Sequence, residues 1–425
     1  MAAPLLEITP EALQASARRV VARCDELARI SSMDWGRIER VYLSPEHARA
    51  NRLSAEWMRD VGLTTHQDAA GNQVGRIDGR DPDAPVLMLG SHLDTVPDAG
   101  RYDGILGVLM AIEVVRLLHA RIPAFPFGIE VIAFSDEEGA RFGKALLGSS
   151  AVAGSWDPAW WELTDADGIT LRQAFLEFGL DPTRISEAAR TPSDLVGYLE
   201  AHIEQGPKLD AAGEALAVVS SIAGARRFQI TVSGEARHAG GTPYDRRRDA
   251  LVGASEAVLA VERLCRAQHH IVGTVGQLEA YPGAVNIVPG EVRLTLDLRG
   301  EIDGVRDEVW RSLAGSLDEI TGRRGLRWTA REVHAASAVM CQPLLMDVMR
   351  AGIEGTGQQN PLDLFSPAGH DGMAIDAIAD VGMLFLRNPD GISHHPDEFV
   401  SRPDIETGLQ AFAEAIVHLA REHAR

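Results

Sequence analysis

The feature that most constrains the fold is a regular alternation of apolar runs and helical patterns within the first two hundred residues. The segments PVLMLGSHLD (85–94) and GIEVIAFSDEEG (128–139) are apolar almost without interruption until they end, which is typical of strands that are buried on both faces. Between them, GILGVLMAIEVVRLLHA (104–120) has the length and composition of a buried helix. Buried strands separated by helices predict an α/β fold with a mostly parallel sheet.

A second pattern begins near residue 222. RRFQITVSGEA (226–236) alternates as a half-buried strand, and a helical segment, two further strands, a helix over 303–320 and a last strand through 333 follow. This βαββαβ order predicts a ferredoxin-like sandwich. Since 425 residues exceed one ordinary core, we expect a catalytic domain of residues 1–221 and 334–425 with an inserted domain of residues 222–333.

Charge and composition exclude some classes of protein. A net charge of −20 disfavours a nucleic-acid surface and means that an acidic substrate needs a local arginine to hold it. We expect no membrane span, because no apolar run reaches the ~18 residues that one requires. The three cysteines, Cys24, Cys265 and Cys341, are odd in number and far apart, which indicates a reducing, cytoplasmic compartment.

Three consecutive acids, Asp136–Glu138, follow the second buried strand. Such a run is often no more than a solvated chain exit, but the preceding strand also ends in polar residues. Sites in parallel sheets collect at the carboxyl ends of the strands. We therefore expect one edge of the sheet to gather carboxylates and imidazoles suited to a divalent metal: His92, Asp94, Asp103, Glu137 and Glu138.

Two further histidine segments are candidates for the same site. In YLEAHIEQGP, His202 faces away from the apolar residues if the segment is a strand, but joins an apolar stripe if it is a helix. The pattern leaves both readings open. The loop GISHHPDEF offers His394 and His395, of which we expect at most one to bind metal, because adjacent side chains point in different directions.

Seven ordered motifs add a resemblance to this interpretation. They are GSHLDTVPDAGRYDG, FSDEEGARFG with LLGSSAVAG, HIEQGP, GEARHAGGTPYDRRRDAL, NIVPGEVRLTLDLR, AGHDGMA and GISHHPDEF, and they span roughly residues 30–410. In this order they resemble the N-carbamoyl-L-amino-acid hydrolase, β-ureidopropionase and allantoate amidohydrolase group. That group belongs to the aminoacylase/carboxypeptidase G superfamily of metallo-hydrolases.

The resemblance implies a role for each matching residue at the metal centre. Two divalent ions (Zn, Mn, Co or Ni) would be held by five ligands, with Asp103 bridging them: His92, Asp103, Glu138, His202 and His394. His394 is preferred to His395 from its spacing to Glu398. Glu137 would be the catalytic base, acting on a hydroxide between the metals, and Asp94 would orient His92.

The resemblance also implies how a substrate is held. His238 would stabilise the oxyanion from a partner subunit, and Arg299 and Asn286 would hold the carboxylate of a ureido acid. Gln205 and His370 are further candidate contacts. From the residues alone, His238 reads as a locally bonded loop histidine and Arg299 as a solvated strand end.

The sequence therefore predicts a hydrolase of linear carbon–nitrogen bonds that cleaves the ureido group of a small anionic N-carbamoyl amino acid. Its inserted domain would act as a lid and form a homodimer. An N-acyl-amino-acid amidase or dipeptidase with the same metals is an alternative. A catalytically silent binding protein is a remote one, since the ligand set and Glu137 are intact.

Overall fold

The computed structural model of the protein describes residues 8–424, which form two compact units. The first unit contains the described residues up to Ser220, Met340–Leu364 and the chain from His370 onward. The second contains Ser221–Val339 and Phe365–Gly369. Residues 1–7 and 425, which the sequence assigns to the larger domain, lie outside the described residues.

The edges of the second unit differ slightly from the expected 222–333. Its last long strand, β13 (Arg327–Ala336), continues past 333, because its pairing with the strand β7 (Gly224–Ser233) extends to the pair of Ala336 with Ala225. Phe365–Gly369 also belongs to this unit, and the Ala223 amide donates to Ser366 O at 2.9 Å.

A nine-stranded sheet runs through the first unit in the order β1-β2-β4-β3-β5-β16-β6-β14, with β15 paired to β6. Neighbours among β4, β3, β5 and β16 are parallel, and antiparallel strands flank them. This confirms an α/β fold with a mostly parallel central sheet. The strands are β1 (Thr64–Gln67), β2 (Gln73–Ile77), β3 (Val86–His92), β4 (Gly128–Phe134), β5 (Leu195–Ile203), β6 (Leu216–Ile222), β14 (Val339–Met340), β15 (Leu362–Ser366) and β16 (Val381–Leu386).

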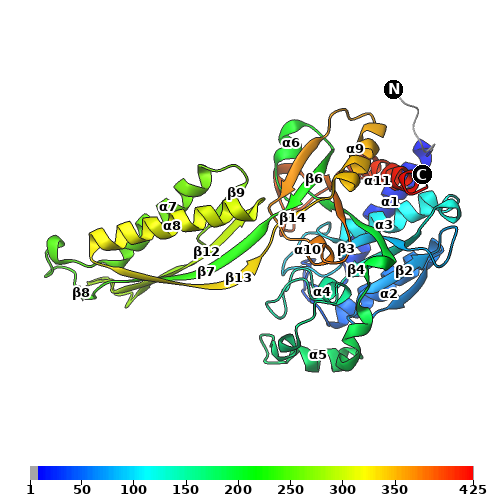
Figure 1. The fold of residues 1–425 in the computed structure, drawn as a ribbon. Helices are drawn as coiled ribbons and strands as arrows, with labels where there is room; N and C mark the ends of the chain where they lie inside the picture. Colours follow the sequence, from blue (N-terminus) through cyan, green and yellow to red (C-terminus); the bar gives the residue numbers. More distant parts are fainter. Residues whose placement is uncertain (1–7, 425) are drawn as a thin grey trace. The chain divides into compact units, whose positions relative to one another are not determined.

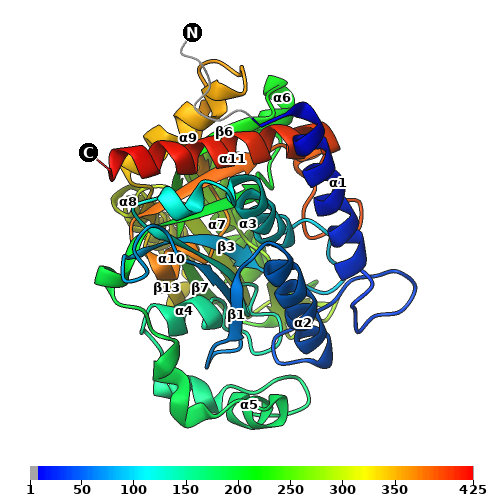
Figure 2. The ribbon, with the colours of Figure 1, turned by 90° about the vertical axis from the view of Figure 1, so that its right-hand side faces the viewer.

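Helices cover this sheet on both sides. Figure 2 shows α3 and α11 on one side of β3 and α4 on the other. The helices of this unit are α1 (Pro10–Leu27), α2 (Pro45–Asp60), α3 (Ile105–Leu118), α4 (Leu147–Val152), α5 (Leu171–Phe178), α6 (Lys208–Ala212), α9 (Pro343–Gly355), α10 (Gly372–Ile375) and α11 (Arg402–Glu422).

The main core lies between the central strands and helices α1, α3, α9 and α11. All residues of β3 and β4 are buried, and so is every residue of α3 from Ile105 to Val115. Burial on both faces explains why these segments are continuously apolar. The candidate site residues follow the carboxyl ends of these strands.

The second unit is built on an antiparallel sheet in the order β10-β12-β7-β13, with β9 also paired to β12. Its apolar core is formed by the sheet and two helices that pack against each other, α7 and α8 (Figure 1). The remaining elements are β8 (Arg237–His238), α7 (Ala250–Arg266), β9 (Ile271–Thr274), β10 (Leu278–Tyr281), β11 (Ile287–Val288), β12 (Glu291–Gly300) and α8 (Asp303–Arg324).

Two further observations bear on the setting of the protein. Among residues 8–424, no helix combines the length and apolar character needed to cross a bilayer. The three cysteines are all buried and unpaired.

Candidate metal centre

The candidate metal ligands lie at the carboxyl ends of four neighbouring parallel strands, β4, β3, β5 and β16. His92 is the last residue of β3, and the pair Glu137 and Glu138 follows the end of β4. His202 lies within β5, so the strand reading of its segment is correct. His394 is in the loop after β16. The register of the sheet thus places side chains that are far apart in the sequence at one edge.

Asp103, in the loop before α3, lies at the centre of this group. Its Oδ1 is 3.2 Å from His202 Nε2 and 3.9 Å from His92 Nε2. Its Oδ2 is 3.1 Å from His394 Nε2, which is itself 3.5 Å from Glu138 Oε1. The two carboxylate oxygens therefore face two different pairs of possible ligands. Oδ1 faces His92 and His202, and Oδ2 faces His394 and, beside it, Glu138.

The two buried histidines are held with Nε2 toward this centre. His202 Nδ1 contacts its neighbour's carbonyl, Ile203 O, at 2.9 Å, and His92 Nδ1 contacts Asp94 O at 3.1 Å. Donation from Nδ1 leaves a lone pair on Nε2, the form that binds metal. His202 Nε2 is buried and has no hydrogen-bond partner among residues 8–424. A metal ion would supply the partner that this atom lacks.

Asp94 organises the turn that carries the two glutamates. Its Oδ1 accepts the backbone N–H of Glu137 and its Oδ2 accepts that of Glu138, each at 3.0 Å. The same Oδ1 lies 3.5 Å from His92 Nδ1. One buried carboxylate thus links the ends of β3 and β4.

Negative charge at the centre is only partly compensated by the protein. Burial raises the pKa of Glu137 well above its ordinary value; His92 opposes the rise, and the charge of Glu138 adds to it. Burial and the Asp103 charge raise the pKa of Glu138 to about 7. Burial also opposes ionisation of Asp103, but contacts with His202 and His394 outweigh it and hold its pKa well below its ordinary value. A divalent cation would balance this cluster, and the mixed nitrogen and oxygen donors suit one.

Unusual backbone conformations shape the loops at this edge. Asp136, Gln205 and His394 have φ values of 60°, 55° and 54°, which are uncommon outside glycine. Gly104, with φ 67°, is required for space, since a Cβ there would lie 2.3 Å from His92 Nε2. Three strained residues at one sheet edge are consistent with a functional site.

Residues that the sequence did not single out as site residues support Asp103. Glu398 Oε1 accepts the backbone N–H of Tyr102 at 2.8 Å and that of Asp103 at 3.0 Å. Ser393 Oγ lies 3.1 Å from both Glu398 Oε2 and Asp103 Oδ2, so its one hydroxyl proton can be donated to either carboxylate. Glu398 lies almost 300 residues from Asp103, so no local pattern could reveal this contact.

The two adjacent histidines of this loop have different partners. His394 Nε2 points to Asp103, whereas His395 Nδ1 accepts the Asp397 N–H at 3.2 Å. His394 is about half exposed, while His92 and His202 are buried. The centre is therefore accessible on the His394 side.

Two candidate substrate contacts lie beside the centre. Gln205 donates from Nε2 to Asp103 Oδ2 at 3.0 Å, and its Oε1 is buried without a hydrogen-bond partner among residues 8–424. The His370 ring packs edge-on against His202, with 4.5 Å between centroids. Burial, with the charge of His202, holds the pKa of His370 well below its ordinary value, so the ring is neutral. Two further groups of possible ligands lie here: Glu200 with His202 and His370, and Glu137 with His92 and Glu138.

The other candidate residues belong to the second unit. His238 and Asn286 are exposed, and the backbone of Asn286 accepts the Ala239 N–H at 2.8 Å. Arg299 is only partly exposed: its Nη2 binds Asp297 at 2.9 Å and its Nη1 donates to Pro367 O at 2.9 Å. It is thus held in place rather than free at a strand end.

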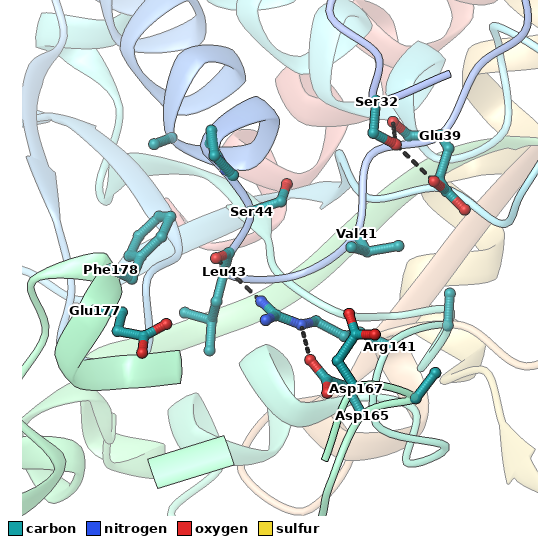
Figure 3. Close-up of a pocket in the computed structure, with 14 residues that line it drawn as sticks. Ser32, Glu39, Val41, Leu43, Ser44, Arg141, Asp165, Asp167, Glu177 and Phe178 are labelled. Atoms are coloured by element: carbon teal, nitrogen blue, oxygen red, sulfur yellow. Dashed lines mark hydrogen bonds and ion pairs between the residues drawn. The ribbon is translucent and has the colours of Figure 1, made fainter. Parts of the chain in front are cut away.

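A hollow of about 730 Å³ lies along the loop that follows Glu138 (Figure 3). On its wall, Arg141 donates from Nε to Asp165 at 3.0 Å and from Nη1 to the carbonyls of Tyr42 and Leu43. The two bonds from Nη1 connect the loop after Glu138 to the segment before α2. Arg141 thus stabilises the turn from outside the metal centre.

Comparisons with known proteins show to which family the chain belongs. The model of peptidase family M20/M25/M40 matches residues 88–418. The chain is 39% identical over 403 residues to an N-carbamoyl-L-amino acid amidohydrolase of Geobacillus stearothermophilus, covering 95% of this chain and 98% of that protein. It is 37% identical to allantoate deiminase 2 of Glycine max, covering 91% and 86%. Among solved structures, a hydantoinase/carbamoylase family amidase from Burkholderia multivorans has a TM-score of 0.86 at 32% identity, covering 95% of this chain and 98% of that one.

Proposed function

Because the chain belongs to peptidase family M20/M25/M40, we propose that it is a metal-dependent amidohydrolase that cleaves the ureido bond of a small anionic N-carbamoyl amino acid or related ureido acid. One water is consumed, and an amino acid, ammonia and carbon dioxide are released. The similarity to amidohydrolases that act on such compounds extends over nearly the whole chain. It favours a linear, non-peptide carbon–nitrogen bond as the target.

The observation that carries this proposal is the placement of Asp103 between two ligand sets. His92 and His202 would hold one divalent ion and Glu138 and His394 the other, with one oxygen of Asp103 directed to each set. Zn, Mn, Co and Ni all accept these nitrogen and oxygen donors. When bound, such ions lower the pKa of a water molecule and polarise a carbonyl group.

We assign the proton transfers to Glu137. Its carboxylate is buried and lies 3.9 Å from His92 Nε2, beside the ligands but outside the two sets around Asp103. Burial raises its pKa well above the ordinary value. A raised pKa makes a carboxylate a better proton acceptor, which suits a group that takes a proton from the attacking water and returns it to the departing nitrogen. Asp94 would fix the position of Glu137 through the backbone hydrogen bond at 3.0 Å.

We assign substrate binding to residues of both units. Arg299 offers a fork of N–H groups that suits a carboxylate, Asn286 is a second donor, and His238 would donate to the oxyanion from a partner subunit. Gln205 and His370, beside the metal centre, are further candidate contacts. In this structure the Nε and Nη2 groups of Arg299 face the Asp297 carboxylate, so a substrate carboxylate would share or replace that partner.

The second unit would act as a ferredoxin-like lid and dimerisation domain. Its antiparallel sheet and two helices, in the order β7, α7, β9 and β10, β12, α8, β13, support that assignment. We also propose a reducing, cytoplasmic location, with three buried free cysteines in support.

A substrate panel tests the proposed activity. The protein is loaded with Mn, Co, Ni or Zn and given N-carbamoyl-L-amino acids, β-ureidopropionate, allantoate, N-acetyl amino acids and dipeptides. Both ammonia and free amino acid are measured. We expect ammonia from at least one ureido acid and little turnover of the acyl and peptide compounds.

Two results would overturn the assignment. Release of amino acid from acyl or peptide substrates, with no ammonia from any ureido acid, would make the protein an amidase or dipeptidase. Absence of all turnover in protein that has bound its metals would favour a binding protein.

A further inference from the structure

We propose that Arg247 is a positioning residue that holds the loop 238–242 so that His238 presents a protonated Nε2 to the substrate. The inference rests on the proposed function, in which His238 donates to the oxyanion. It concerns residues of the second unit alone. Hydrogen bonds join the guanidinium to the loop and the loop to the histidine ring.

The first step concerns which ring nitrogen of His238 carries the proton. The backbone N–H of Gly241 donates to His238 Nδ1 at 2.9 Å. A backbone amide can only donate, so Nδ1 must offer a lone pair, and the proton of the neutral ring is on Nε2. A ring in this tautomer is a ready donor to a developing oxyanion.

The second step concerns how the loop keeps Gly241 in place. The Thr242 N–H and its Oγ1 both donate to His238 O, at 3.1 and 2.8 Å. This closes a tight turn around Gly240 and Gly241. Two adjacent glycines give the backbone much freedom, so the turn depends on groups outside it for a single conformation.

Arg247 supplies that support. Its Nε donates to Thr242 O at 3.0 Å and its Nη2 donates to Ala239 O at 2.6 Å. These carbonyls flank the two glycines, so one planar guanidinium fixes both ends of the glycine pair. The guanidinium also stacks on the Tyr244 ring, 4.2 Å from its centroid. A lysine lacks this fork and would reach only one carbonyl well.

The surroundings of Arg247 provide a control and a means of rescue. Arg247 lines a hollow of about 990 Å³, which makes its position reachable by a free guanidinium ion. Arg246 lines the same hollow, but its side chain makes no hydrogen bond or ion pair with any of residues 8–424. Arg246→Ala removes the same charge from the same hollow without removing the support.

The test combines kinetics with the tautomer of His238. In the full-length, zinc-loaded chain, carbon and nitrogen chemical shifts of labelled histidine report the tautomer, and His238→Ala assigns the signal. We expect Nε2–H in the wild type and in Arg246→Ala, and a mixture of tautomers in Arg247→Ala. The kcat of Arg247→Ala should fall about 10- to 100-fold at similar KM, less than the ~10²–10³-fold loss expected for removing an oxyanion donor. Added guanidinium ion should restore both the Nε2–H tautomer and the kcat of Arg247→Ala. For Arg247→Lys we expect a tautomer ratio and a kcat between those of the wild type and Arg247→Ala.

An unchanged tautomer in a folded Arg247→Ala variant, with unchanged kcat, would overturn the proposal. So would an equal loss of kcat in Arg246→Ala. If Arg247→Ala does not fold, the same readouts in Arg247→Lys decide the question. The tautomer does not depend on turnover, so a wild-type activity in His238→Ala would refute the oxyanion role and leave the support by Arg247 standing.

Discussion

At the scale of single residues, Asp94 shows how one buried carboxylate can set the positions of several reactive groups. It accepts two consecutive backbone N–H groups, those of Glu137 and Glu138, and lies beside the His92 ring. Burial opposes its ionisation, but the His92 contact and these amides outweigh burial and lower its pKa. It therefore stays ionised and keeps its acceptor role.

Glu137→Gln is expected to separate metal binding from turnover. The amide keeps the shape of the side chain and the backbone bond to Asp94, but it cannot accept a proton. We expect the variant to bind metal like the wild type, by elemental analysis, with kcat lower by roughly 10²–10⁴-fold, the usual contribution of a general base. A variant that keeps most of its turnover would remove Glu137 from this role.

The residues differ in how far the sequence could predict their surroundings. His92 and Glu138 are next to strand ends and Asp103 is in the loop that opens α3, so the alternation of strands and helices places them at one edge. From the residues alone, either His394 or His395 could face the site, and only the resemblance to the family favoured His394. The hydrogen bonds from Glu398 to the Asp103 loop could not be predicted, because they join segments that meet only in the folded chain.

At the scale of elements, the parallel register of β4, β3, β5 and β16 assembles the centre. The spacing of apolar residues alone could not decide whether the segment around His202 was a strand or a helix. Pairing of β5 with two neighbours, β3 and β16, settles it as a strand. The long-range pairing of strands therefore decides what local periodicity cannot.

The loop after β4 also depends on a buried histidine at the start of α2. His47 Nδ1 accepts the Leu43 N–H at 3.1 Å, and its Nε2 lies 3.0 Å from Ser135 Oγ, just before the acidic run. Burial lowers the pKa of His47 from 6.5 to about 4. The unfolded chain therefore binds a proton between these values that the folded chain does not.

The contribution of His47 to the free energy of unfolding is accordingly expected to fall as the pH drops from about 6.5 to about 4, by an amount on the order of 3 kcal/mol. Urea unfolding of His47→Gln across this range should show a flatter pH dependence than the wild type, whatever its offset at neutral pH. His66→Gln, at an exposed histidine, should keep the wild-type slope. An equal slope in His47→Gln and wild type would contradict this account.

At the scale of the whole molecule, the change from continuous to alternating apolar patterns predicted a domain boundary near residue 222, and the second compact unit begins at Ser221. The short return of Phe365–Gly369 to that unit could not be predicted, since these five residues have no periodicity of their own. The proposed donation from His238 to the active site of a partner subunit also belongs to this scale.

Mixing two inactive variants tests whether His238 acts on a partner subunit. In a dimer of Glu137→Gln with His238→Ala, one site has both an intact Glu137 and an intact partner histidine. Random exchange of subunits should restore about one quarter of wild-type activity, because half the dimers are mixed and each has one complete site of two.

Glu137→Gln mixed with the double variant Glu137→Gln, His238→Ala is the control and should stay inactive. Lack of recovery in mixtures whose subunits have exchanged would place the oxyanion donor elsewhere. A protein that sediments as a monomer and has wild-type activity would also show that the oxyanion donor does not come from a partner subunit.

The central claim is that metal ions are required to hydrolyse an N-carbamoyl amino acid. The most direct test measures ammonia release from an N-carbamoyl-L-amino acid that is a substrate, together with the metal content of the protein. The account predicts that release falls to background when a chelator has removed the metals and returns when Mn or Zn is added back. Unchanged ammonia release from protein whose metal content has fallen to background would contradict it.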